Sequence, residues 1–355
     1  MHEGRNGMAV AVDPLAPLLA AEGAIVLDGG LATQLEAQGA DLTDALWSAR
    51  LLLEDPEAIV HAHLTFFRAG ARVATSASYQ ATFEGFARRG IDHETAADLL
   101  RLSVTLADEA RRNVRPDPRP GEADTHLVAA SVGPYGAMLA DGSEFRGRYG
   151  RTGAELQVFH RERMETLADA GADLLACETI PELEEGVALA DLLDELDVTG
   201  WLSFSCADGA RLRSGAPVEE AFALADGSAG VRAVGVNCTP PEYIDELLER
   251  AASVTTKPLI VYPNSGEGWD ASSRAWLPAP SAASRIQVDE HSALRWMDGG
   301  ARLLGGCCRV TPTAIAEVAA AVRSRAAATP DAPGTVGRER GGQPQATAGP
   351  TRRPS

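Results

Sequence analysis

Short runs rich in Val, Ile, Leu and Ala recur along the chain, and nearly every run is followed by a stretch with helical spacing of its apolar residues. These runs are continuously apolar, which is typical of parallel strands that are buried on both faces. The eight runs span residues 24–30, 71–79, 126–133, 172–179, 200–206, 231–238, 258–264 and 301–308. Eight strand-helix repeats predict an α/β protein with a single-domain (β/α)8 TIM barrel.

The alternative fold is a doubly wound open sheet, in which a dinucleotide would bind after the first strand. The segment "DGGLATQLEAQG" contains glycines there but lacks the G-x-G-x-x-G spacing that this binding requires, so the barrel is favoured. Several helix starts are also marked. Asp55 followed by Pro56 predicts an N-cap and first turn, and Thr239 and Thr311 are expected to cap later helices.

The two ends of the chain differ from the repeating part. We expect residues 1–20 to be an N-terminal lead-in and residues 21–326 to form the barrel. Residues 327–355 are rich in Pro, Gly, Thr and Arg and have no apolar periodicity, which predicts a disordered tail.

Composition restricts the possible partners and locations. Hydrophobic residues make up 45% of the 355 residues, and the formal net charge of −18 repels nucleic acid and anionic lipid surfaces. The first residues lack a basic segment followed by an uninterrupted apolar stretch, and no later run reaches the roughly 18 apolar residues of a membrane span. We therefore expect a cytoplasmic protein that binds neither nucleic acid nor membranes.

Cysteines suggest where the chemistry is. Cys238 ends the sixth run and the adjacent Cys307 and Cys308 end the eighth, so closure of a barrel would bring three thiols to one rim. Three sulfur ligands without a fourth protein ligand suit Zn²⁺ in an open site that leaves one position for water or substrate. Gly305 and Gly306 are expected to permit close approach and unusual backbone angles where two consecutive side chains face one ion.

Other interpretations of the cysteines remain. A thiol redox protein could use Cys307 and Cys308, although adjacent cysteines form a disulfide only with strain. A non-catalytic zinc protein would close the site with Cys206 as a fourth ligand. For Cys177 and Cys206 we favour simple packing, with Cys177 facing away from its neighbour in the chain.

An open zinc-thiolate site has a characteristic chemistry. The metal can bind an incoming thiol and remove its proton at neutral pH, which makes the sulfur a nucleophile. The natural reaction is the transfer of an alkyl group to that sulfur. Polar side chains at the predicted strand ends would surround it: Asp28, Ser78, Tyr79, Ser131, Glu178, Asn237 and Asn264.

An ordered set of segments from about residue 24 to 322 resembles the homocysteine S-methyltransferase family. The segments are "LDGGLATQLEAQG", "LWSA", "TSASYQAT", "SVGPYGAMLADGSEFRG", "GADLLACETIPE", "GVNC", "YPNSGE" and "LLGGCCRVTP". They are most similar to the branch that uses S-methylmethionine and often S-adenosylmethionine as the methyl donor. The resemblance implies a barrel enzyme that methylates homocysteine to methionine, with Zn²⁺ on Cys238, Cys307 and Cys308 and no flavin, folate, nucleotide or cobalamin.

The resemblance also implies substrate contacts. Asp28 and Glu178 would bind the homocysteine ammonium, and Ser131 with the backbone of "SVGPYG" is a candidate for its carboxylate. Trp47 and Tyr79 are candidates for the sulfonium of the donor, although aromatic packing is the alternative.

Further residues have less defined roles. Asn237 and Asn264 are expected to orient ligands or donor, and the segment with Asp141, Glu144 and Arg146 is a candidate lid with donor contacts. Betaine as the donor and selenocysteine as the acceptor remain alternatives.

Overall fold

The computed structural model describes residues 12–42, 47–114, 126–270, 275–277 and 287–328. For residues 47–49, 268–270 and 275–277 it describes the backbone alone. Trp47, the lead-in before residue 12 and the tail after residue 328 therefore lie wholly or partly outside the described residues, and the proposed domain limits stay predictions.

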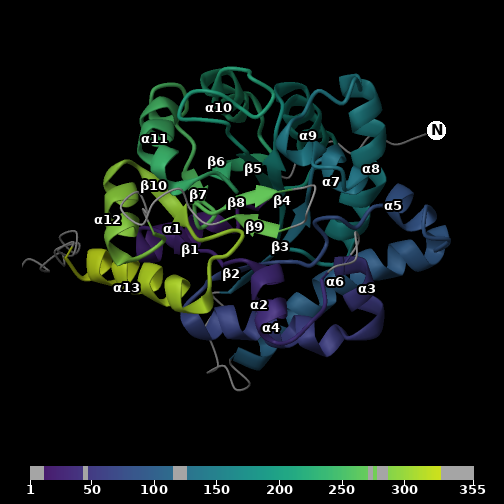
Figure 1. The fold of residues 1–355 in the computed structure, drawn as a ribbon. Helices are drawn as coiled ribbons and strands as arrows, with labels where there is room; N and C mark the ends of the chain where they lie inside the picture. The colour runs from purple at the N-terminus through teal and green to yellow at the C-terminus, as the bar shows by residue number, and fades with distance from the viewer. Residues whose placement is uncertain (1–11, 43–46, 115–125, 271–274, 278–286, 329–355) are drawn as a thin grey trace, which may run out of the picture.

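Eight parallel strands form the barrel, one from each predicted run (Figure 1). They are β1 (Ile25–Val26), β2 (Val73–Thr75), β3 (Leu127–Val132), β4 (Leu174–Ile180), β5 (Gly200–Phe204), β6 (Val231–Asn237), β7 (Leu259–Tyr262) and β10 (Ala301–Leu304). Their hydrogen-bonded order is β1-β10-β7-β6-β5-β4-β3-β2. The bridge between Leu27 and Val73, with a hydrogen bond from Arg72 N to Val26 O (2.7 Å), joins β2 to β1 and closes the ring. The predicted TIM barrel is confirmed.

Helices surround the strands and connect each to the next (Figure 1). They are α2 (Leu31–Ala37), α3 (Trp47–Glu54), α4 (Pro56–Ala69), α5 (Phe83–Ala87), α6 (His93–Val114), α7 (Tyr135–Leu139), η1 (Ser143–Phe145), α8 (Gly153–Asp169), α9 (Leu183–Glu195), α10 (Val218–Gly227), η2 (Pro241–Tyr243), α11 (Ile244–Ala252), α12 (Glu290–Asp298) and α13 (Pro312–Ala328). Asp55 caps α4 as predicted, since its side chain accepts a hydrogen bond from Ala58 N. The prediction for Thr239 was wrong, because α11 begins only at Ile244 and the Thr239 hydroxyl is used inside the barrel.

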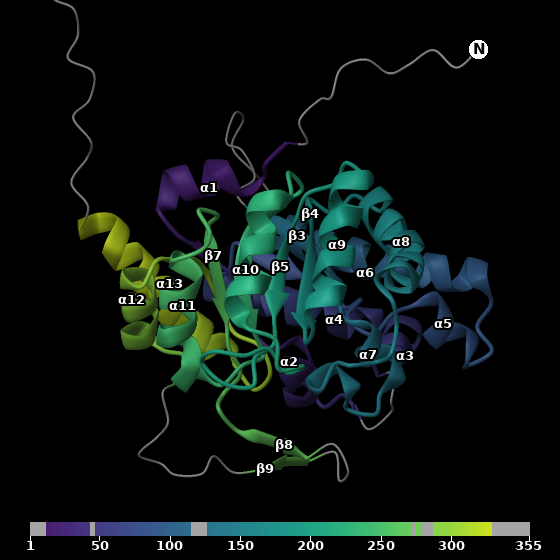
Figure 2. The same cartoon turned by 90° about the horizontal axis from the view of Figure 1, so that it is seen from above.

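The interior of the barrel is apolar at the amino ends of the strands. Inward-facing side chains include Ile25, Leu174, Trp201 and Ile260, and a short helix adds Leu15 and Leu18 to the same cluster. That helix is α1 (Leu15–Glu22), which lies in the stretch treated above as a lead-in. Figure 2 shows α1 at the opposite end of the barrel from the carboxyl ends of the strands. Apolar side chains thus fill the interior at the amino ends of the strands, and the polar side chains of the candidate site lie at the carboxyl ends.

A two-stranded antiparallel hairpin follows β7 and was not predicted. It consists of β8 (Gly268–Asp270) and β9 (Ala275–Leu277), and it projects from the carboxyl end of the barrel (Figure 2). Among the described residues, no helix is both long enough and apolar enough to span a membrane.

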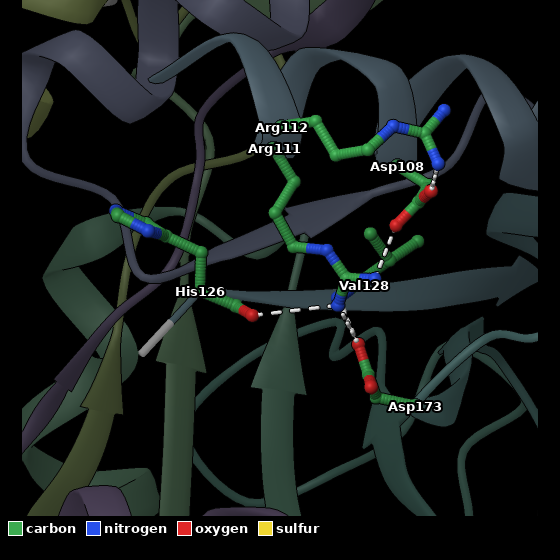
Figure 3. A network of polar contacts seen from close by, with 6 residues as sticks. All are labelled: Asp108, Arg111, Arg112, His126, Val128 and Asp173. Atoms are coloured by element: carbon green, nitrogen blue, oxygen red, sulfur yellow. Dashed lines mark hydrogen bonds and ion pairs between the residues drawn. The ribbon is translucent and has the colours of Figure 1, made fainter. Parts of the chain in front are cut away.

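A polar network fastens α6 to the amino ends of β3 and β4 (Figure 3). Arg111 donates to Asp173 Oδ2 (2.8 Å) and also pairs with Asp108, while Asp173 Oδ2 accepts a hydrogen bond from Val128 N (2.7 Å). This network lies at the end of the strands where α1 packs, so we expect it to stabilise the fold without contacting substrates.

Candidate active site at the carboxyl ends of the strands

Three cysteine sulfur atoms meet beyond β6 and β10. Cys238 Sγ lies 3.6 Å from Cys308 Sγ, Cys307 Sγ lies 3.9 Å from Cys308 Sγ, and all three lie within 4.8 Å of one another. A tetrahedral zinc ion with Zn–S bonds of about 2.3 Å holds its sulfur ligands about 3.8 Å apart. The three sulfur positions therefore fit one such ion. No other group of three potential ligands this close is found in the described part of the chain.

The backbone turns sharply where it carries these cysteines. β10 ends at Leu304, so the chain has left strand geometry before Cys307 and Cys308, as expected. The expectation that Gly305 and Gly306 adopt unusual backbone angles was wrong, since neither has a positive φ. Their role is steric: a Cβ on Gly305 would lie 2.6 Å from Leu27 Cβ, and one on Gly306 would lie 2.1 Å from Val310 Cγ1.

The strained backbone is instead at Cys238 and Arg309. Their φ angles are +47° and +66°, in the left-handed region that side chains rarely adopt. Cys238 is held there by a hydrogen bond from its N–H to Tyr262 O (3.2 Å), and Asn264 Nδ2 donates to Cys238 O (3.3 Å). Backbone strain of this kind is often retained at functional sites.

Asn237 connects the cysteines to the neighbouring strands. Its Oδ1 accepts hydrogen bonds from Thr179 N (2.7 Å) and Ser203 Oγ (2.9 Å). Its Nδ2 donates to Thr179 Oγ1 (2.8 Å) and lies 4.0 Å from Cys307 Sγ. The structure therefore places the Asn237 amide within hydrogen-bonding reach of Cys307 Sγ, and its role in orienting the ligands stays a prediction.

Two buried carboxylic acids face the same region. Asp28 is 4% exposed and accepts hydrogen bonds from Thr75 N (2.7 Å) and Thr75 Oγ1 (3.1 Å). Glu178 is 8% exposed, and its Oε1 accepts a hydrogen bond from Ser131 Oγ. Neither acid forms an ion pair with a described Lys, Arg or His.

Burial controls the protonation of both acids. It raises the pKa of Asp28 to about 8, and the nearby Glu178 and Cys307 contribute in the same direction. Burial likewise raises the pKa of Glu178 to about 8, with Cys307 adding to the rise and the Ser131 and Tyr262 hydroxyls opposing it. Two buried acids without a cationic partner among the described residues are suited to binding a cationic group such as an ammonium.

Ser131 is fixed by two serines after β2. Ser131 N donates to Ser76 Oγ (3.1 Å), and Ser78 Oγ donates to Ser131 O (2.7 Å). These two bonds involve the Ser131 backbone, and its hydroxyl donates to Glu178. The predicted contact of Ser131 with the homocysteine carboxylate stays a prediction.

Tyr79 lies beside this group, half-buried. The Cys238 and Glu178 side chains are near enough to add to the rise in its pKa that burial causes. A Cβ on Gly133 would lie 2.4 Å from Tyr79 O, so the glycine is required for this close approach. The side chain of Trp47 lies outside the described residues.

The two remaining cysteines are buried away from the sulfur cluster. Cys177 and Cys206 have no exposed surface and belong to the apolar layer between strands and helices. Neither belongs to the group of potential metal ligands found among the described residues. Burial raises the pKa of both thiols to about 12, which is typical of cysteines that only pack.

Sequence reasoning missed Thr75 and Tyr262. Thr75 holds Asp28, and Tyr262 supports Glu178 and accepts a hydrogen bond from Trp201 Nε1 (3.0 Å). Both side chains continue the inward-facing alternation of their strands. Counting every second residue from an inward apolar position would have found them.

Comparison with known proteins agrees with this site. The model of the homocysteine S-methyltransferase family matches residues 25–322. A Bacillus subtilis protein named homocysteine S-methyltransferase YbgG is 46% identical over 88% of this chain and 99% of its own. A selenocysteine Se-methyltransferase of Brassica oleracea var. italica is 47% identical over 82% of this chain and 87% of its own.

A solved structure is similar over nearly the same range. The metallated form of the homocysteine methyltransferase MmuM from Escherichia coli matches with a TM-score of 0.77 and 44% identity, covering 87% of this chain and 99% of that one. The match of the family model covers most of the chain, and the curated relatives exceed 40% identity. The chain therefore belongs to the homocysteine S-methyltransferase family.

Proposed function

We propose that the protein transfers a methyl group from a sulfonium donor, S-methylmethionine or S-adenosylmethionine, to the sulfur of homocysteine and so forms methionine. The observation that carries the proposal is the arrangement of three thiols at the spacing of metal ligands beside two buried acids that have no cationic partner in the described chain. The thiols suit the activation of a substrate sulfur, and the acids suit the ammonium of an amino acid.

Cys238, Cys307 and Cys308 are the residues that would hold zinc. Hydrogen bonds from Cys238 and Cys307 lower the pKa of the Cys308 thiol, which favours a thiolate in this cluster. There zinc would offer an open position to the substrate thiol and would lower the pKa of that thiol.

Asp28 and Glu178 orient the homocysteine in this scheme. When the ammonium of homocysteine enters, its positive charge lowers the pKa of both acids, which then release protons and accept charge-assisted hydrogen bonds. Thr75 and Ser131 keep the two carboxylates in place throughout. The amino acid is thus held by its ammonium end while its thiol reaches the cysteine cluster.

The transfer itself is a direct displacement. The homocysteine sulfur donates an electron pair to the methyl carbon of the donor, and the bond from that carbon to the sulfonium sulfur breaks. The donor sulfur keeps the electron pair of the broken bond and becomes a neutral thioether. With S-methylmethionine both products are methionine, and the positive charge of the donor is consumed. We propose Tyr79 as a contact of the sulfonium, since its ring lies beside Glu178 and Cys238.

Selenocysteine is a second candidate acceptor. The Brassica relative named selenocysteine Se-methyltransferase is as similar to this chain as the homocysteine enzymes are. A selenolate would use the same cluster and the same acids, so only a direct comparison of acceptors distinguishes the two.

The proposal is tested with the metal-loaded protein, homocysteine and each donor in turn, with methionine as the readout. We expect methionine from S-methylmethionine, and loss of both product and bound zinc in Cys238→Ala. The matched control is Cys206→Ala. Cys206 follows β5 and is buried in the apolar layer between strands and helices, outside the sulfur cluster, so this variant should keep its zinc. Full activity of Cys238→Ala without metal would contradict the proposal.

A further inference from the structure

Two loops meet beyond the carboxyl ends of β4 and β5. The first follows β3 and contains η1, and the second follows β5. Arg148 of the first loop donates from Nε to Ser214 O of the second (2.8 Å), and the Arg213 guanidinium lies over the Phe145 ring at 5.9 Å. Arg213 N donates to Ser205 O (3.1 Å), which fastens the second loop to the end of β5.

Four polar side-chain atoms in these loops are buried without a hydrogen-bond partner in the described structure. They are Glu144 Oε2, Tyr149 Oη, Arg213 Nε and Ser214 Oγ. Leaving such an atom unpaired is unfavourable, because it loses its hydrogen bonds to water and gains none in the protein. Most buried polar atoms in proteins are paired, so four unpaired atoms on two adjoining loops indicate a group that the chain itself does not supply.

The two charged members of this set have opposite signs: Glu144 belongs to η1, and Arg213 lies over the ring of the next η1 residue, Phe145. Glu144 lies toward the active site: its carboxylate, like Cys238 and Glu178, adds to the rise in the pKa of Tyr79. Arg213 lies on the β5 side, where its charge lowers the pKa of Cys206. Cys206 N in turn donates to Thr239 Oγ1 (3.0 Å), and Thr239 directly follows Cys238 in the chain.

We propose that Glu144 and Arg213 bind the ammonium and the carboxylate of the amino-acid end of the methyl donor. This inference rests on the proposed function. The homocysteine ammonium already has Asp28 and Glu178, so a second pair of opposite charges, with Glu144 toward Tyr79 and Arg213 against Phe145, suits a second zwitterion. A methyl-sulfonium amino acid has this charge pattern, whereas betaine carries a carboxylate and no primary ammonium. The pair thus selects α-amino-acid sulfonium donors.

The test compares shortened donors with matched variants of the zinc-loaded enzyme. The donors are S-methylmethionine, the same sulfonium without its amino group, and the same sulfonium without its carboxylate. We expect kcat/KM of the wild type to fall about 10- to 100-fold for each shortened donor, the range for a lost charged hydrogen bond. Glu144→Gln should show a similar loss with S-methylmethionine but little further loss with the donor that lacks the amino group. Arg213→Met should behave in the same way toward the donor that lacks the carboxylate.

Several controls make the outcome decisive. Arg211→Met removes an exposed arginine of the same loop, which pairs with Asp208 at 3.2 Å, and should leave the donor KM unchanged. Zinc content and the homocysteine KM should be unaltered in Glu144→Gln and Arg213→Met. If Arg213→Met does not fold, Arg213→Lys replaces it, and the donor series on the wild type still applies.

The possible failures are distinguishable. If the wild type uses the shortened donors as well as S-methylmethionine, or if the variants raise the homocysteine KM and leave the donor KM unchanged, the inference is overturned while the proposed function stands. If the wild type transfers methyl from no sulfonium donor, the proposed function fails and the inference fails with it.

Discussion

Replacing Glu178 by glutamine removes one of the two buried acids while conserving its shape. In the folded protein burial raises the pKa of Glu178 from 4.5 to about 8. The folded protein therefore keeps a proton that the unfolded chain releases between these two pH values. Because the folded pKa is the higher one, the stability that this proton contributes is complete below pH 4.5 and is lost as the pH rises through about 8.

The size of this effect follows from the two pKa values. Their difference, 8 − 4.5 = 3.5, corresponds to about 5 kcal/mol in total, at about 1.36 kcal/mol for each pH unit. Proton linkage assigns about 2.5 kcal/mol of that total to the interval between about pH 6 and pH 8.5. Glu178→Gln lacks this contribution, so its free energy of unfolding relative to the wild type should rise by about 2.5 kcal/mol over the same interval.

Urea unfolding of zinc-loaded wild type and Glu178→Gln at both pH values measures the difference. Zinc ligands are deprotonated cysteines, so in the zinc-loaded folded state of both proteins the three thiols hold no proton that could titrate over this interval. The variant should also bind homocysteine about 10- to 100-fold more weakly, because it loses a charged hydrogen bond to the ammonium, and should keep its zinc. Equal pH dependence of stability in both proteins, together with unchanged homocysteine affinity, would refute the reasoning.

Three further substitutions probe other parts of the structure. Asn237→Ala leaves Thr179 N buried without an acceptor, so we expect a loss of about 1–3 kcal/mol in unfolding free energy and a lower kcat, both measurable on purified protein. His63→Leu should raise the free energy of unfolding by about 1–3 kcal/mol, because His63 is fully buried and both ring nitrogens lack hydrogen-bond partners in the described structure. Burial lowers the pKa of His63 to about 4, so the wild type should also lose stability as the pH falls from 6.5 toward 4, and the leucine variant should lose less. Asp173→Asn breaks the ion pair with Arg111 at the amino end of the barrel and should lower the midpoint of thermal unfolding by an amount equivalent to about 1 kcal/mol, with kcat and KM unchanged; a loss of activity in the folded variant would contradict the separation of the two ends.

The barrel could be predicted from the sequence because its strands are buried on both faces. Each continuous apolar run, such as the one around Leu174–Ile180, became a strand of the ring. The hairpin β8–β9 could not be predicted in this way, because it does not contribute to the barrel and its short strands show no such run. Thr239 was assigned a capping role from local residue types, but its hydroxyl instead accepts a hydrogen bond from Cys206 N within the barrel layer.

Part of the candidate site could be predicted from the sequence for the same reason. The ends of the strands are fixed by the apolar runs, so the sequence alone places Cys238 and the pair after β10 on one rim of the barrel. The partners that hold the acids, Thr75 and Tyr262, were missed because their roles depend on which residues face inward. The unpaired atoms of Glu144 and Arg213 depend on how two loops pack, which no local pattern encodes.

We propose that Cys238, Cys307 and Cys308 hold one zinc ion and leave a position for the thiol of homocysteine. X-ray absorption at the zinc edge of the purified enzyme, before and after addition of homocysteine, measures the ligands directly. We expect three sulfur ligands and one oxygen or nitrogen ligand before addition, and four sulfur ligands afterwards. Four sulfur ligands before addition, or no change when homocysteine binds, would contradict it.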